Sequence, residues 1–220
     1  MRSLWTVLSV FALVLPVWAQ AGAAQGVFQI DFSNAGLVPS HWVLTLHPDG
    51  SGHFLSERGS APPDPAEGLQ APGVDRDIQV SAEFAQRVFE TARQQNFFNE
   101  DCESHLKMAF QGWKKLSYSG SAGRGNCKYN YSKNKEIEEF GDSLIAVAET
   151  ILEGSRLEVL LKHDRLGLDK EMEYMVEAAK DGRLQQFSTI RSILERLADD
   201  DEVLDRVRNR AKMLLKRAET

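Results

Sequence analysis

The sequence is poor in cysteine and has no hydrophobic run long enough to cross a membrane. Only two of its 220 residues are cysteines. Its longest apolar stretch, residues 4–17, contains Pro16 near its end. This stretch is also shorter than the roughly 20 residues that a membrane-spanning helix needs. We therefore expect no transmembrane span in the mature chain.

Motifs that mark several enzyme classes are missing as well. The sequence has no G-x-S-x-G, H-E-x-x-H or C-x-x-C pattern and no Asp-rich calcium loop. It has no basic stripe with interleaved aromatic residues outside its C-terminal mixed-charge segment, and its formal net charge is −6. Because nucleic-acid binding relies on neutralising phosphates, we exclude nucleic acid as a partner. The sequence predicts no cofactor, no metal site and no recognised catalytic set.

What the sequence does contain is an N-terminal leader. Arg2 provides one positive charge, an apolar run follows, and small residues end the segment. These are the features of a secretory signal peptide, which we predict over residues 1–19 with cleavage between Ala19 and Gln20. Cleavage after Ala21 or Ala23 and an uncleaved leader that anchors the chain are alternatives. The sequence thus predicts an exported protein, either periplasmic or secreted.

Both cysteines lie in the part of the chain that would be exported. An oxidising compartment favours a structural disulfide between Cys102 and Cys127. In the chain-entropy model, closing a loop of this length stabilises a fold by about 3.5 kcal/mol. A redox or metal-binding pair is the alternative, but the wide spacing and the lack of a C-x-x-C pattern disfavour it.

Patterns of β structure dominate the beginning of the predicted mature chain. Residues 27–32 alternate imperfectly between apolar and polar, and residues 41–47 are rich in β-branched and aromatic side chains. A turn at Asp49 and Gly50 leads into residues 53–57, which predicts a hairpin because these two residue types accept the φ angles of tight turns. The proline-rich segment 58–73 predicts a surface loop.

A second hairpin is predicted further along the chain. Its strands are residues 106–110 and 114–119, with the turn around Gly112. Residues 127–131 predict a third short strand. The glycine-rich segment 120–125, which precedes it, is typical of a flexible loop.

Helical periodicity accounts for the remaining apolar residues. It predicts helices at 81–95 and 134–153, with Gly154 ending the second. We therefore expect an α+β domain over residues 26–154, in which a small antiparallel sheet of two hairpins is packed by helices. The pattern over residues 155–218 predicts three or four further helices, which form a C-terminal helical hairpin or bundle region.

The order of elements over residues 41–152 resembles small exported bacterial α+β domains of unknown function. The positions that carry this resemblance are Asp49-Gly50, Phe97-Phe98, and Gly112 with Lys114 and Lys115. The cysteine pair and the long helical C-terminal region depart from that pattern. The resemblance implies fold and location only, and it assigns no catalytic residue.

Two polar groups are candidate functional sites. A metal site is conceivable around the first hairpin, but its spacing matches no known ligand set, and solvated side chains are the simpler interpretation. That group comprises His41, His47, Asp49 and His53. An acidic cluster follows the first helix and is either one half of a hydrolytic carboxylate pair or a solvated edge. It comprises Glu100, Asp101 and Glu103.

Weaker features have simple structural interpretations beside their functional ones. Asn130-Tyr131-Ser132 matches the glycosylation sequon, although Ser132 can equally cap a helix. Segment 163–169 is either a recognition surface or a joint in which Gly167 ends one helix and Asp169 caps the next.

We predict an exported, non-catalytic binding or interaction protein of the periplasm or extracellular space, because no coherent catalytic set is present. Its partner would be a protein or another envelope component. Residues 202–217 form a predicted amphipathic helix rich in basic residues, which can dock an acidic partner or contact an anionic membrane surface peripherally. The alternative is a hydrolase of an envelope or extracellular polymer that uses dispersed carboxylates and histidines.

Overall fold

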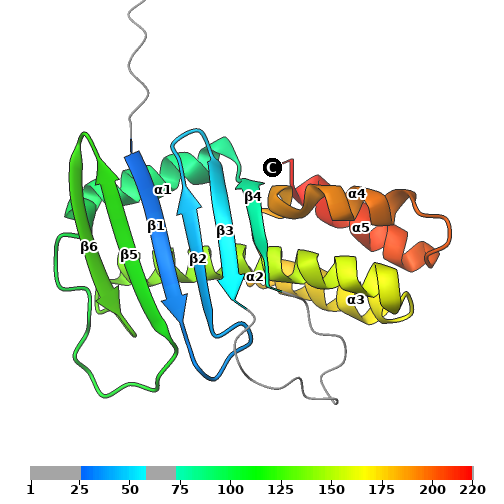
Figure 1. Cartoon of the computed structure of the whole chain (residues 1–220), viewed down its shortest axis with the longest axis horizontal. Helices are drawn as coiled ribbons and strands as arrows, with labels where there is room; N and C mark the ends of the chain where they lie inside the picture. The colour runs from blue at the N-terminus through cyan, green and yellow to red at the C-terminus, as the bar shows by residue number, and fades with distance from the viewer. Residues whose placement is uncertain (1–25, 58–72, 220) are drawn as a thin grey trace, which may run out of the picture.

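The computed structural model describes residues 26–57 and 73–219 and has the predicted α+β class (Figure 1). The predicted leader lies outside the described residues, and so does most of the proline-rich segment. Among the described residues, no helix is long and apolar enough to cross a membrane.

A six-stranded antiparallel sheet forms one half of the molecule. Its strand order is β4-β3-β2-β1-β5-β6, so β1 lies between the β2–β3 pair and the β5–β6 pair, and β4 forms the edge beside β3 (Figure 1). The strands are β1 (Gly26–Ser33), β2 (His41–Leu46), β3 (Ser51–Glu57), β4 (Asp75–Gln79), β5 (Trp113–Gly120) and β6 (Gly123–Tyr129). The predicted first hairpin is confirmed, because β2 and β3 pair around the turn at Asp49 and Gly50.

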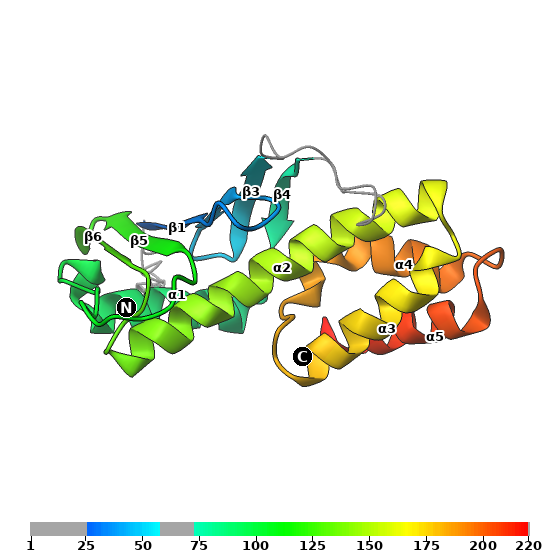
Figure 2. The ribbon, with the colours of Figure 1, turned by 90° about the horizontal axis from the view of Figure 1, so that it is seen from below.

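Strict alternation of burial gives the sheet one covered face. In β1, Phe28, Ile30 and Phe32 point inward and are buried, whereas the residues between them point to the opposite face. Helices α1 (Ala82–Gln94) and α2 (Lys135–His163) pack against the inward side chains. The opposite face carries no described helix or strand (Figure 2).

The second predicted hairpin is wrong in position. Residues 106–110 form no strand, and the hairpin consists of β5 and β6 instead. The segment 120–125, predicted as a flexible loop, is the tight turn and the start of β6. Packing requires glycine at two of its positions, since a Cβ atom at Gly123 would lie 2.3 Å from the Phe97 ring and one at Gly125 would lie 2.5 Å from the Phe97 carbonyl oxygen.

Helix α2 does not end at Gly154 as predicted but continues to His163. Gly154 is instead the point where another segment crosses the helix closely. A Cβ atom there would lie 2.3 Å from Cγ2 of Ile190, which is itself buried. The predicted boundary between residues 154 and 155 therefore falls inside a continuous helix of 29 residues.

The remaining helices form a second layer of structure around the C-terminal half of α2. They are α3 (Gly167–Lys180), the short 3₁₀ helix η3 (Phe187–Ile190), α4 (Arg191–Asp199) and α5 (Asp205–Arg217). Their apolar faces and the end of α2 enclose a separate hydrophobic core. This helical region lies beside β4, at the edge of the sheet (Figure 1).

Polar contacts connect the two cores where α2 passes from one to the other. Arg76 on β4 makes a bidentate ion pair with Glu158 on α2, at 3.2 and 3.0 Å. The backbone amide of Ser81 donates to the Gln186 side chain at 2.8 Å, and the hydroxyl of Ser188 donates to the Gln79 carbonyl at 3.0 Å. The segment that contains η3 is thereby attached to the end of β4.

The close crossing at Gly154 predicts that alanine destabilises the protein there. Helix propensity favours Gly154→Ala by about 1 kcal/mol, but overpacking against Ile190 costs about 1–3 kcal/mol and outweighs that gain in a buried contact. We expect a lower free energy of unfolding in urea titrations. The double variant with Ile190→Ala should lose less than the sum of the single variants, and strict additivity would contradict the steric explanation.

Candidate functional site

The segment between η2 (Asn96–Phe98) and β5 exposes an unusual set of side chains. From residue 99 to residue 112 it has no regular secondary structure. Leu106, Met108 and Phe110 alternate along it, and they are 51%, 45% and 55% exposed. A loop of this kind usually turns its apolar residues inward, because burial of each large side chain contributes roughly 1.5–3 kcal/mol.

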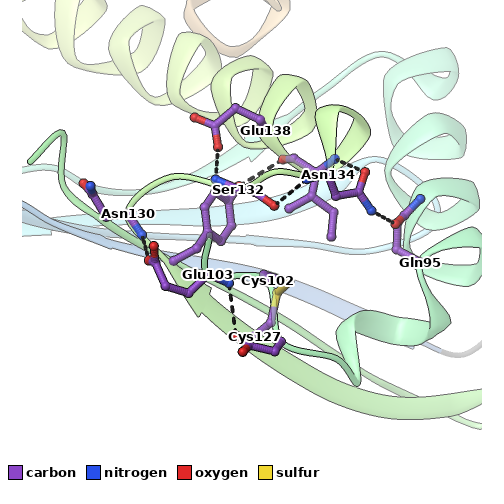
Figure 3. Close-up of a disulfide and its surroundings, with 11 residues drawn as sticks. Gln95, Cys102, Glu103, Cys127, Asn130, Ser132, Asn134 and Glu138 are labelled. Atoms are coloured by element: carbon purple, nitrogen blue, oxygen red, sulfur yellow. Dashed lines mark hydrogen bonds between the residues drawn. A yellow bond between two sulfur atoms is a disulfide. The ribbon is translucent and has the colours of Figure 1, made fainter. Parts of the chain in front are cut away.

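The disulfide fixes the beginning of this segment. Cys102 and Cys127 are bonded, as predicted, and their Cα atoms lie 5.7 Å apart. Cys127 belongs to β6, so the bond ties the segment to the edge strand of the sheet (Figure 3). Both cysteines are buried, and so is Ser104.

Glu103 adds a second attachment next to the disulfide. Its carboxylate accepts a hydrogen bond from the backbone amide of Asn130 at 2.6 Å (Figure 3). It also accepts one from the backbone amide of His105 at 3.3 Å. The amide of Ser104 donates to the Tyr131 carbonyl at 2.9 Å. Partial burial acts to raise the pKa of Glu103, but the hydrogen bonds outweigh it, so the pKa lies below its ordinary value and the carboxylate stays ionised at neutral pH.

Two asparagines hold the far end of the segment. The Asn130 side chain accepts from the Gln111 amide at 2.7 Å and donates to the Ala109 carbonyl at 3.2 Å. The Asn34 side chain, from the connection between β1 and β2, donates to the Gln111 carbonyl at 3.1 Å. The loop backbone is therefore held at several points while its apolar side chains face solvent.

Neighbouring residues extend the exposed apolar surface. Trp113 at the start of β5 is 38% exposed, and its ring lies 5.8 Å from that of Phe110. Leu37 and Val38 are exposed in the β1–β2 connection, and the Asn34–Gln111 hydrogen bond brings this connection against the loop. Both connections lie at the same end of the sheet (Figure 1). We call the six residues the apolar tip: Leu37, Val38, Leu106, Met108, Phe110 and Trp113.

Basic residues accompany the apolar tip. Lys107 is exposed between Leu106 and Met108. The Lys128 Nζ atom lies 4.7 Å from the centroid of the Trp113 ring, in a cation–π contact. Lys115 is paired with Lys128 across β5 and β6 and faces the same uncovered side of the sheet.

The polar group around the first hairpin, for which solvated side chains were the simpler interpretation, does not assemble into a metal site. His53 binds Asp75 at 3.1 Å and Asp77 at 2.9 Å on β4, and the hydrogen bond with Asp77 raises the pKa of its imidazole. His41 pairs with Asp31 instead, at 3.1 Å. Over residues 26–57 and 73–219, no group of three or more His, Cys, Asp or Glu side chains could hold a metal ion.

The predicted acidic cluster separates into structural roles. Asp101 binds His105 at 2.7 Å, and this contact together with the Glu103 amide holds the pKa of Asp101 below its ordinary value. Glu103 holds the loop, as described above. The sequon residue Asn130 uses both ends of its side chain to hold the same loop, which is a structural role.

The helix-to-helix joint and the basic helix α5 also differ from expectation. Gly167 begins α3 rather than ending α2, and Asp169 lies within α3. Asp169 binds Arg206 at 2.5 Å and Arg210 at 2.6 Å, which lowers its pKa. Arg208 pairs with Asp205. Three of the basic side chains predicted to dock a partner are therefore engaged within the fold.

Sequence reasoning missed a partly buried acidic group between α2 and α3. Burial, and secondarily the nearby carboxyl of Glu171, raise the pKa of Glu153 to about 8. Arg156 lies 2.7 Å from Glu171 and compensates its charge. Burial also raises the pKa of Glu149, which lines a neighbouring pocket of about 460 Å³ with Tyr174 and Arg183. The i, i+4 spacing of Glu149 and Glu153, which places both carboxyl groups on one face of the helix, was the available signal.

Comparison with known proteins adds no relative. No protein-family model matches the chain, and no curated protein matches it. The resemblance to exported bacterial domains of unknown function therefore stays a prediction.

Removing the disulfide should release the loop. The double variant Cys102→Ser/Cys127→Ser opens a crosslink with a sequence separation of 25 residues, so we expect the free energy of unfolding to fall by about 3.5 kcal/mol. Amide hydrogen exchange should accelerate over residues 103–112 more than in α3. Reduced wild-type protein is the matched control, and unchanged exchange in the loop would show that the disulfide does not order it.

Because the pKa of Glu153 is raised, we expect the free energy of unfolding to depend on pH. The pKa of this carboxyl is about 8 in the folded chain and 4.5 for the free group. The unfolded chain therefore releases this proton first, and stability is lost as pH rises from about 4.5 to about 8. Glu153→Gln should flatten this decline in urea titrations at several pH values, whereas Glu177→Gln on the exposed face of α3 should not. Parallel declines for wild type and Glu153→Gln would refute the assignment.

Proposed function

We propose that the chain is an exported, non-catalytic binding protein that contacts its partner in the periplasm or outside the cell through the apolar tip. One observation carries this proposal. Leu106, Met108 and Phe110 face solvent on a loop whose backbone is held by a disulfide and by the side chains of Glu103 and Asn130.

The energetics of the loop support a binding role. A contiguous exposed apolar patch marks an interaction site more often than scattered apolar residues do. Ordering a free loop on binding costs conformational entropy, and a loop that is already held in place avoids most of that cost. The attachments therefore favour a surface that is presented to a partner.

Export rests on two supporting observations. The N-terminal sequence has the pattern of a signal peptide. The Cys102–Cys127 disulfide is of the kind that persists in oxidising compartments. Intact mass of the protein from envelope and culture-medium fractions tests export directly, because a chain that keeps its first nineteen residues in the cytoplasm would contradict it.

Site-specific crosslinking tests the binding surface. A photoreactive amino acid at Met108 should form an adduct in cells that express the protein, whereas the same group at Met213 should not. Met213 lies on α5 and is 52% exposed, similar to Met108. Asn130→Ala should lower the Met108 yield several-fold, because it frees the loop backbone without removing an apolar side chain. Equal yields at both positions would contradict the proposal.

The pocket beside Glu149 supports the alternative, a hydrolase of an extracellular or envelope polymer. A carboxyl group with a raised pKa in a cleft is a candidate general acid. The hydrolase alternative also uses histidines, but none is among the residues that line this pocket. Glu149→Gln distinguishes the two functions, because it should abolish hydrolysis of such a polymer but leave crosslinking at Met108 unchanged.

A further inference from the structure

We infer that the partner of the apolar tip is the anionic surface of a phospholipid bilayer, into which the tip inserts at headgroup depth. This inference rests on the binding role proposed above and names the partner. It is carried by three features of the loop: the kinds of side chain it exposes, the hydrogen bonding of its backbone and the charges around it.

The side chains of the tip suit the membrane interface. All six are apolar or aromatic, and none carries an acidic group. Trp113 is amphipathic, begins β5 and is 38% exposed, whereas Met108 and Phe110 precede it in the loop and are more exposed. Tryptophan is enriched at the level of lipid headgroups, where one side of its ring is wet and the other apolar.

The loop backbone is prepared for an environment with little water. Six backbone amides between Glu103 and Gln111 donate hydrogen bonds inside the chain, to side chains and carbonyls of the protein itself. The carbonyls of Ala109 and Gln111 accept from the side-chain amides of Asn130 and Asn34. A backbone polar group that enters lipid without a partner costs several kcal/mol. Internal hydrogen bonding at these positions removes that cost.

The charges around the tip favour anionic lipid. The chain as a whole is acidic, with a formal net charge of −6, yet Lys107, Lys115 and Lys128 lie within or beside the tip. Three acidic groups of this region have partners: Asp31 binds His41, Asp101 binds His105, and Glu103 accepts the Asn130 amide. Lysines next to inserted apolar residues gain affinity from anionic headgroups.

Tryptophan fluorescence gives a direct test on the protein purified from the envelope or culture medium. Cleavage of the predicted leader removes Trp5 and Trp18, so the protein used has an intact mass that lacks residues 1–19. Of the two remaining tryptophans, Trp42 is only 4% exposed and already shielded, so a change in emission reports mainly on Trp113. Vesicles of equal parts phosphatidylglycerol and phosphatidylcholine should shift the emission to shorter wavelength and co-sediment with the protein. Trp113→Phe should remove the shift. Vesicles of phosphatidylcholine alone should bind far less.

Variants separate the apolar and electrostatic contributions. Phe110→Ser should weaken vesicle partitioning about tenfold, and Met213→Ser, which is distant and equally exposed, should leave it unchanged. Lys107→Gln and Lys128→Gln should each weaken binding to anionic vesicles about fivefold. Lys212→Gln on α5 is the matched control. Circular dichroism verifies that each variant is folded.

The outcomes distinguish this inference from the proposed function. Vesicle binding that depends on Phe110 and on phosphatidylglycerol supports the membrane surface. Absence of vesicle binding, or binding that Phe110→Ser does not weaken, overturns it. If a protein or a second copy of the chain crosslinks at Met108 while vesicles do not bind, the binding role stands and the membrane inference fails. If neither vesicles nor crosslinked partners are found, both fail.

Discussion

Helix α2 supplies buried side chains to both hydrophobic cores, and the position of the other elements follows from its continuity. Its N-terminal half covers the sheet, and its C-terminal half is enclosed by α3, α4 and α5. A shared helix holds the two halves together only if other segments pack closely against it where the two cores meet. Gly154 allows Ile190 to do so, and the Arg76–Glu158 pair secures the edge of the sheet to the same stretch of helix.

At the opposite end of the sheet, stability and surface chemistry are arranged differently. The loop after Cys102 contributes little apolar burial of its own, so its order depends on the disulfide, on the hydrogen bonds that Asn130 accepts and donates, and on those that Glu103 accepts. Each is modest in net energy because each replaces a hydrogen bond to water. Together they hold a backbone that hydrophobic collapse alone would leave free, and this is why an exposed apolar surface can coexist with a defined loop.

The two regions of perturbed charge have different causes. At the loop, hydrogen bonds keep Glu103 ionised despite partial burial. Between α2 and α3, burial dominates, so Glu153 holds its proton at neutral pH beside the charged pair of Glu171 and Arg156. The first arrangement fixes the conformation of a surface. The second makes the stability of the helical region fall as pH rises from about 4.5 to about 8, and it lies far along the chain from the apolar tip.

The sequence by itself determined the α+β class, the first hairpin and helix α1, because hydrophobic period and turn residues are local signals, and so is Ser81, whose hydroxyl accepts the Phe84 amide at the start of α1. It also determined the partnership of the two cysteines, because the chain has no others. Only the tertiary structure decided that Gly154 lies inside a helix, that the glycines after residue 120 belong to a hairpin, and that Leu106, Met108 and Phe110 face solvent. In each case the deciding contact comes from a distant residue: Ile190 for the helix, Phe97 for the hairpin and Asn130 for the loop. A glycine that permits close packing looks the same in the local sequence as a glycine that ends a helix. An exposed alternation of apolar residues likewise has the same period as a buried strand. Which of the two structures forms depends on distant contacts that no local pattern specifies.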